Sequence, residues 1–79
     1  MGNSGITREN IAKTDLRTLW SDTLIELLLD AVKEEWPERI IKDLVKELYN
    51  KGYKPERLMK LLEQKLGPDA AKKTARFLL

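Results

Sequence analysis

Four carboxylates at a regular spacing of four residues are the first feature of this sequence that could do chemistry. They are Asp22, Glu26, Asp30 and Glu34. Because helical positions four apart are neighbours on the surface, these carboxylates would share one face of a helix. We call them the acidic ridge. Carboxylate oxygens on one face could hold a divalent cation or dock a basic partner. The chain contains no histidine, however, and metal sites in helical bundles use Glu-x-x-His pairs. We therefore predict no metal ligand, and expect a solvated face that lysines of a neighbouring helix compensate.

The basic C-terminal part is the second such feature. Residues 51–79 hold eight bases and three acids, whereas residues 1–50 hold seven bases and ten acids. Bases clustered on one helix can bind nucleic-acid phosphates, which makes Lys72, Lys73 and Arg76 the candidate contacts. The alternative is that this half of the chain complements the acidic ridge within the same molecule. We favour the alternative, because the asymmetry is modest.

No residues for catalysis or cofactor binding are evident. The chain has neither histidine nor cysteine, which removes the commonest proton shuttle and the thiol nucleophile. Ser4 and Ser21 have no base nearby, and Gly52 and Gly67 are isolated rather than parts of a phosphate-binding loop. A chain of 79 residues also has little room for a pocket of about 300 Å³. We expect no enzyme activity, no cofactor and no small-molecule substrate.

Five short helices are expected to position these residues. Capping residues, apolar spacing near 3.6 residues and stop signals predict helices over about 7–13, 16–35, 37–51, 55–66 and 68–78. Pro37 and Pro55 suit first helical positions, while Gly52 and Gly67 suit helix ends. A fresh start at Ser21 would break the second helix. No segment alternates with the period of two that is typical of a strand.

The fold class predicted from these segments is all-α, as one domain over residues 1–79 with residues 1–5 loose. Helices of unequal length favour a compact irregular or orthogonal bundle over a simple up-down one. Trp20 and Trp36 are expected at the edge of the core, at the two ends of the long helix. The predicted core consists of Leu24, Leu27, Leu28, Ala31, Ile41, Leu44, Val45, Leu48, Leu58, Leu61, Leu62, Leu66, Ala71, Ala75 and Leu78.

Charge placement supports the same helices. An acid precedes a base by four residues at Glu38–Lys42, Glu47–Lys51, Glu56–Lys60 and Asp69–Lys73. Each such pair stabilises a helix by roughly 0.2–0.5 kcal/mol. Local propensity, apolar patterning, helix stops and charges therefore all favour one structure, which is what a protein designer aims for.

Three hypotheses about function follow. The first is a thermostable, designed helical protein made as a fold. The second is a natural protein-interaction or oligomerisation module, such as a homodimer, with an exposed apolar patch around Trp36, Tyr53 or Leu78–Leu79. The third is a small nucleic-acid-binding protein that uses its basic C-terminal helices. No apolar run is long enough to span a membrane, and a natural protein without cysteine or a secretory leader is expected in the cytoplasm.

Overall fold

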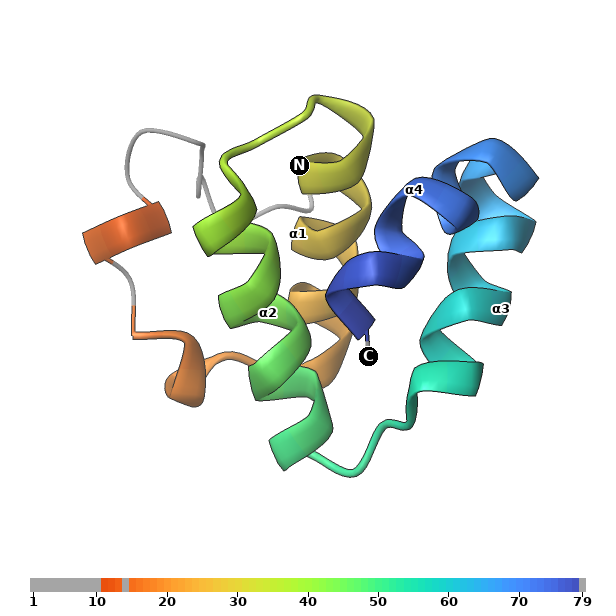
Figure 1. The fold of residues 1–79 in the computed structure, drawn as a ribbon. Coiled ribbons are helices and arrows are strands. Elements are labelled where there is room, and N and C mark those ends of the chain that lie inside the picture. The colour runs from red at the N-terminus through yellow and green to blue at the C-terminus, as the bar shows by residue number, and fades with distance from the viewer. Residues whose placement is uncertain (1–10, 14, 79) are drawn as a thin grey trace.

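Two helical hairpins make up the fold in the computed structural model, which describes residues 11–13 and 15–78 (Figure 1). The first hairpin consists of α1 (Ser21–Lys33) and α2 (Glu38–Asn50). The second consists of α3 (Pro55–Leu66) and α4 (Pro68–Leu78). Two short 3-10 helices, η1 (Ile11–Lys13) and η2 (Leu16–Thr18), precede them. The described residues contain no strand, so the predicted all-α class is confirmed.

The predicted count of five helices is wrong, because the described residues form four α-helices. The helix expected over 16–35 is interrupted, since Leu19 and Trp20 both have extended backbones and α1 begins at Ser21. The interruption lets η2 turn towards α2, where Leu16 and Leu19 contact the core. The helix expected over 7–13 lies largely outside the described residues, and its described end is the 3-10 helix η1.

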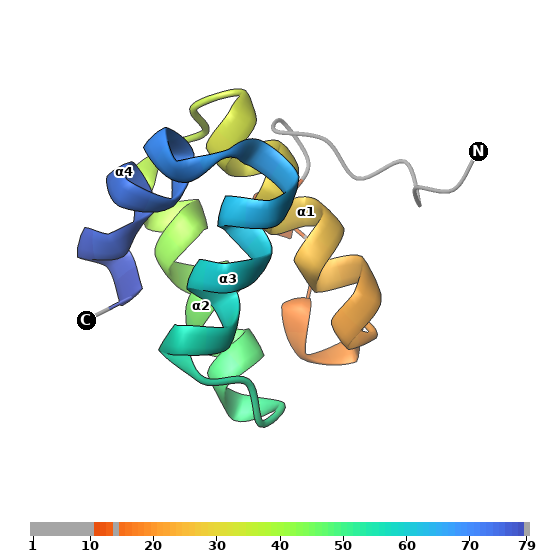
Figure 2. The same cartoon turned by 90° about the vertical axis from the view of Figure 1, so that its right-hand side faces the viewer.

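Helix α1 is exposed along the acidic ridge and packs against the rest of the bundle on its other side. It contacts α2, α3 and α4, as expected for the segment with the widest apolar surface (Figure 2). Helix α4 also contacts the other three helices, whereas α3 contacts mainly α4 and α1. The two hairpins therefore bury one shared set of side chains rather than two separate cores.

Twelve of the fifteen predicted core residues are buried. Leu61, Leu66 and Ala75 are only half-buried, and the prediction is wrong for these three. Helix α3 is covered by fewer neighbours than α1, so the margins of its apolar stripe stay accessible. On α4 the buried line runs through Ala71, Thr74 and Leu78, which leaves Ala75 on its flank. Ile11, Trp36 and Thr74 are buried although they were not in the predicted core.

A Schellman motif ends α2 and turns the chain towards α3. The Tyr53 amide donates to the carbonyl of Leu48, and the Gly52 amide donates to the carbonyl of Tyr49, each at 3.0 Å. Gly52 has φ +103°, a conformation that side chains with a Cβ rarely adopt. The predicted glycine stop at Gly52 is therefore confirmed.

The same motif ends α1, but with a glutamate in the glycine position. The Trp36 amide donates to the carbonyl of Ala31 at 2.9 Å, and the Glu35 amide donates to the carbonyl of Val32 at 3.4 Å. Glu35 has φ +55°, and it is the one non-glycine residue with positive φ in the described part of the chain. The turn from α1 to α2 thus places a strained carboxylate-bearing residue next to a buried tryptophan.

Candidate functional site

The three candidate phosphate contacts lie together on the rim of one groove. Lys72, Lys73 and Arg76 are exposed residues of α4, and they border a depression of about 590 Å³ against the turn from α1 to α2. Figure 1 shows that turn beside α4. We call the uncharged residues that line the depression the floor of the groove; they are Val32, Trp36, Pro37, Ile41, Thr74 and Phe77. The expectation that so short a chain has little room for a pocket of this size is therefore wrong.

Two carboxylates share the rim with these bases. Glu35 and Glu38 belong to the turn and to the start of α2, and they line the groove opposite α4. A guanidinium nitrogen of Arg76 donates to the Glu38 carboxylate at 3.0 Å. The Arg76 guanidinium also lies 4.9 Å from the ring centroid of Phe77. The groove therefore has an apolar floor and a rim that carries charges of both signs.

A second depression of about 450 Å³ adjoins the groove. Val32, Glu35 and Lys73 line both depressions, so the two form a continuous surface. The second depression adds the charged residues Lys33, Lys65 and Asp69 and the apolar residues Leu66 and Ala70. Lys73 thus lies at the junction, where it faces both halves of the surface.

Most of the predicted acid–base pairs along the helices are not formed. Within the described residues, the ion pairs are Arg17–Asp15, Lys51–Glu47 and Arg76–Glu38. Of the four predicted pairs, only Glu47–Lys51 is present, at 3.8 Å. Glu38 contacts Arg76 of α4 instead of Lys42, and Lys73 is not paired with Asp69. The lysines of the groove are consequently left without carboxylate partners in the described structure.

The acidic ridge is not compensated by a neighbouring helix. Asp22, Glu26, Asp30 and Glu34 are all exposed, and none of them forms an ion pair with a described residue. The expected compensation by lysines is wrong, because the ridge lies on the solvent side of α1. Over residues 11–13 and 15–78, no three acidic side chains lie close enough together to hold a metal ion. Glu34 instead accepts a hydrogen bond from the Trp36 indole nitrogen at 3.2 Å.

The two tryptophans differ sharply in exposure, which the sequence did not reveal. Trp36 is 5% exposed and lines the groove, whereas Trp20 is 82% exposed. Helix α1 between them rises about 20 Å, so they lie beyond opposite ends of α1. The expected apolar patch is wrong for Trp36 and Leu78, which are buried. Tyr53 is half-buried beneath Arg57, and Leu79 lies outside the described residues.

The groove itself had no signal in the sequence. Its walls come from segments more than thirty residues apart, such as Glu38 and Arg76, and no local pattern reports their proximity. Within the described part of the chain, no helix combines the length and apolar character needed to cross a bilayer. Comparisons of this chain with protein-family models, curated proteins and solved structures find no match.

Proposed function

We propose that this protein is an interaction module that holds a segment of a partner chain in the groove beside α4. The observation that carries this proposal is the composition of the groove, with an apolar floor and a charged rim. Protein interfaces are built in the same way, with an apolar core surrounded by a polar rim. The volume of about 590 Å³ is also large enough to accept several side chains.

Binding is favoured over catalysis because of the side chains that surround the groove. The charged residues there are lysine, arginine and glutamate, and the chain contains no histidine or cysteine. Among the residues that line the groove, Thr74 is the one with a hydroxyl group. This hydroxyl donates a hydrogen bond to the Ala70 carbonyl at 2.8 Å. A free hydroxyl or thiol nucleophile next to a histidine base, a common arrangement for covalent catalysis, is therefore missing from the described groove.

Binding of nucleic acid through Lys72, Lys73 and Arg76 is less well supported. Affinity for a phosphate backbone depends on several bases that are free to neutralise phosphates. Arg76 is engaged by Glu38, and the Glu35 carboxylate lies in the same groove. A phosphate backbone would also leave the apolar residues that line the groove, such as Val32 and Phe77, without an apolar partner.

A designed fold without a partner remains the alternative proposal. The buried side-chain nitrogen and oxygen atoms of the described residues all have hydrogen-bond partners, as a design requires. Two other features favour a natural binding protein: the exposed Trp20 and the positive φ of Glu35. Idealised designs avoid non-glycine residues at positive φ, and natural proteins depart from local rules where function is located.

The two tryptophans provide a direct test. We would replace both with fluorotryptophan and record one fluorine NMR signal for each, assigned with Trp20→Phe. The probes would be peptides selected on the intact protein from a random library. Peptides about 12 residues long exceed the 29 Å longest extent of the molecule when extended.

The expected result is that selected peptides shift the Trp36 signal and leave the Trp20 signal unchanged. Failure to enrich any peptide, or a response confined to Trp20, would overturn the groove as the binding site. Analytical sedimentation of the free protein would show whether it forms a homodimer, which is a separate possibility from the outcomes above. A dimer whose formation moves the Trp36 signal would make a second copy of the chain the occupant.

A further inference from the structure

We propose that the partner segment held in the groove is acidic. An apolar side chain of this segment, flanked by the segment's own carboxylates, inserts into the groove. This inference rests on the proposed function and names the chemistry of the partner. Its basis is the distribution of charge around the groove and the adjoining depression, together with the position of the accessible apolar residues.

The combined rim carries more bases than acids. Its five bases are Lys33, Lys65, Lys72, Lys73 and Arg76, and its three acids are Glu35, Glu38 and Asp69. The Arg76–Glu38 pair removes one residue from each set. Four lysines and two carboxylates then remain to meet an occupant. The surface is thus complementary to a segment with an excess of negative charge.

Lys73 differs from the other three lysines because it lies where the two depressions meet. It lines both depressions, and the expected partner one turn earlier, Asp69, does not neutralise it. An ammonium group at this junction can pair with a carboxylate of an occupant that extends over either half of the surface. Lys72 lies next to it on the groove side.

An apolar side chain of the occupant would meet Val32 and Phe77. Both residues are half-buried and line the groove, whereas Trp36 and Ile41, which also line it, are almost fully covered. Burial of apolar surface is the main favourable contribution to most protein associations. A nucleic acid offers no aliphatic side chain for this floor, and a basic segment would be repelled by the free lysines.

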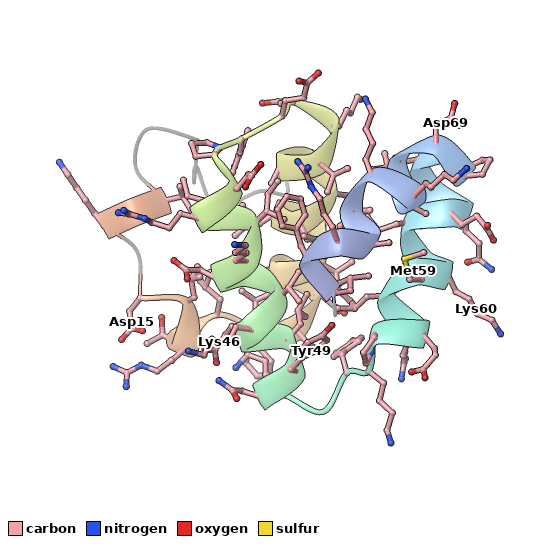
Figure 3. All side chains as sticks on the ribbon, viewed as in Figure 1. Asp15, Lys46, Tyr49, Met59, Lys60 and Asp69 are labelled. Atoms are coloured by element: carbon pink, nitrogen blue, oxygen red, sulfur yellow. The ribbon has the colours of Figure 1, made fainter. Side chains whose placement is uncertain are left out.

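The test compares two charge reversals of the same kind on neighbouring helices. Lys73→Glu changes the junction of the groove, and Lys60→Glu is the matched control on α3. Figure 3 shows Lys60 projecting away from the bundle, and it lines neither depression. Both variants have the same net charge, so a general electrostatic effect would appear in both. Thermal melts of the two variants would show that each remains folded.

The expected result is that library peptides that shift the Trp36 signal are enriched in Asp and Glu together with one or two large apolar residues. Lys73→Glu should weaken their binding about tenfold or more, because like charges then face each other, and Lys60→Glu should leave it nearly unchanged. Added salt should weaken binding to the unmodified protein, since the lysines concerned are exposed.

Three outcomes would overturn the inference. Groove-binding peptides without an excess of acids would refute it but leave the interaction module intact. Equal losses of peptide affinity in Lys73→Glu and Lys60→Glu would also refute it and leave the interaction module intact. Displacement of the peptides by a single-stranded oligonucleotide that shifts Trp36 would favour nucleic acid as the ligand. If no peptide moves the Trp36 signal at all, the proposed function itself fails.

Discussion

The hydroxyl of Tyr49 donates a 2.7 Å hydrogen bond to the main-chain carbonyl of Leu78 and thereby joins the last turn of α2 to the last turn of α4. The two residues lie 29 positions apart in the chain. Figure 3 shows Tyr49 close to the end of α4. The carbonyls of the last helical turn have no partner within the helix, so this bond satisfies one of them.

Removal of this hydroxyl should destabilise the protein modestly. We expect Tyr49→Phe to lower the free energy of unfolding by about 1 kcal/mol, the usual net value of one hydrogen bond. Tyr53→Phe is the matched control, because the Tyr53 ring is half-buried and its hydroxyl makes no hydrogen bond to a described residue. Urea unfolding of both variants measures the difference. Equal losses in the two variants would contradict a specific role for the Tyr49–Leu78 bond.

The same tyrosine predicts a loss of stability at alkaline pH. Burial raises the pKa of the Tyr49 hydroxyl above its ordinary value of 10.0, and the nearby Glu56 carboxylate adds to the effect. The folded protein therefore favours the neutral hydroxyl. Its contribution to stability is fully present below the unfolded pKa and is lost as pH rises through the folded pKa. Stability measured above pH 10 should fall less steeply in Tyr49→Phe than in the parent, and identical curves would refute this prediction.

Replacement of Glu35 by glycine should stabilise the protein. A non-glycine residue in the left-handed region costs roughly 1–2 kcal/mol, and the greater chain entropy of glycine offsets about 0.5–1 kcal/mol of that gain. We therefore expect Glu35→Gly to stabilise the protein by about 0.5–1 kcal/mol. Glu35→Ala is the control, since it removes the carboxylate but keeps the strained backbone. A larger gain for Glu35→Ala than for Glu35→Gly would show that charge, rather than backbone conformation, sets the effect.

Replacement of Gly52, which holds the equivalent position at the end of α2, should destabilise the protein. A Cβ atom added there would meet no atom within 4 Å, so only the backbone conformation at φ +103° opposes substitution. Gly52→Ala is expected to lower the free energy of unfolding by about 0.5–1 kcal/mol. Chemical unfolding at one temperature would measure this change beside that of Glu35→Gly. A stabilised Gly52→Ala would contradict the assignment of the two helix ends to one motif.

The two tryptophans should have unequal effects on stability. Trp36 is 5% exposed, so Trp36→Ala should destabilise the protein by about 3–5 kcal/mol. Trp20 is 82% exposed, and Trp20→Ala should stay within about 0.5 kcal/mol of the parent. Thermal and urea unfolding would measure both. A large loss for Trp20→Ala would mean that this side chain is covered in solution, for example by a second copy of the chain.

Truncation of the central leucines tests the assignment of the core. Leu28 and Leu44 are 2% and 0% exposed, so each change to alanine should cost about 2–5 kcal/mol. Leu61→Ala should cost less, because that residue is only half-buried. An unchanged melting temperature for Leu44→Ala would show that the central apolar stripe of α2 is wrongly assigned.

The sequence alone determined the all-α class, the three helices α2, α3 and α4, and most of the core. Each depends on local rules: apolar side chains recur on one helix face, and Gly52 ends a helix because it readily adopts positive φ. The bounds of α2 show the precision of these rules, since Pro37 lies just before the first helical residue rather than at it.

Tertiary packing decided the rest. The sequence allowed a helix start at Ser21 without requiring one. In the structure α1 begins there, η2 packs against α2, and Trp20 is left in solvent. Glu38 pairs with Arg76 rather than Lys42 because packing of α4 brings a base from 38 positions away to the start of α2. The groove arises in the same manner. Helical periodicity specifies which face of each segment is buried. The hydrophobic effect that drives this burial does not specify which apolar face packs against which. Only the assembled bundle therefore sets which helix ends meet.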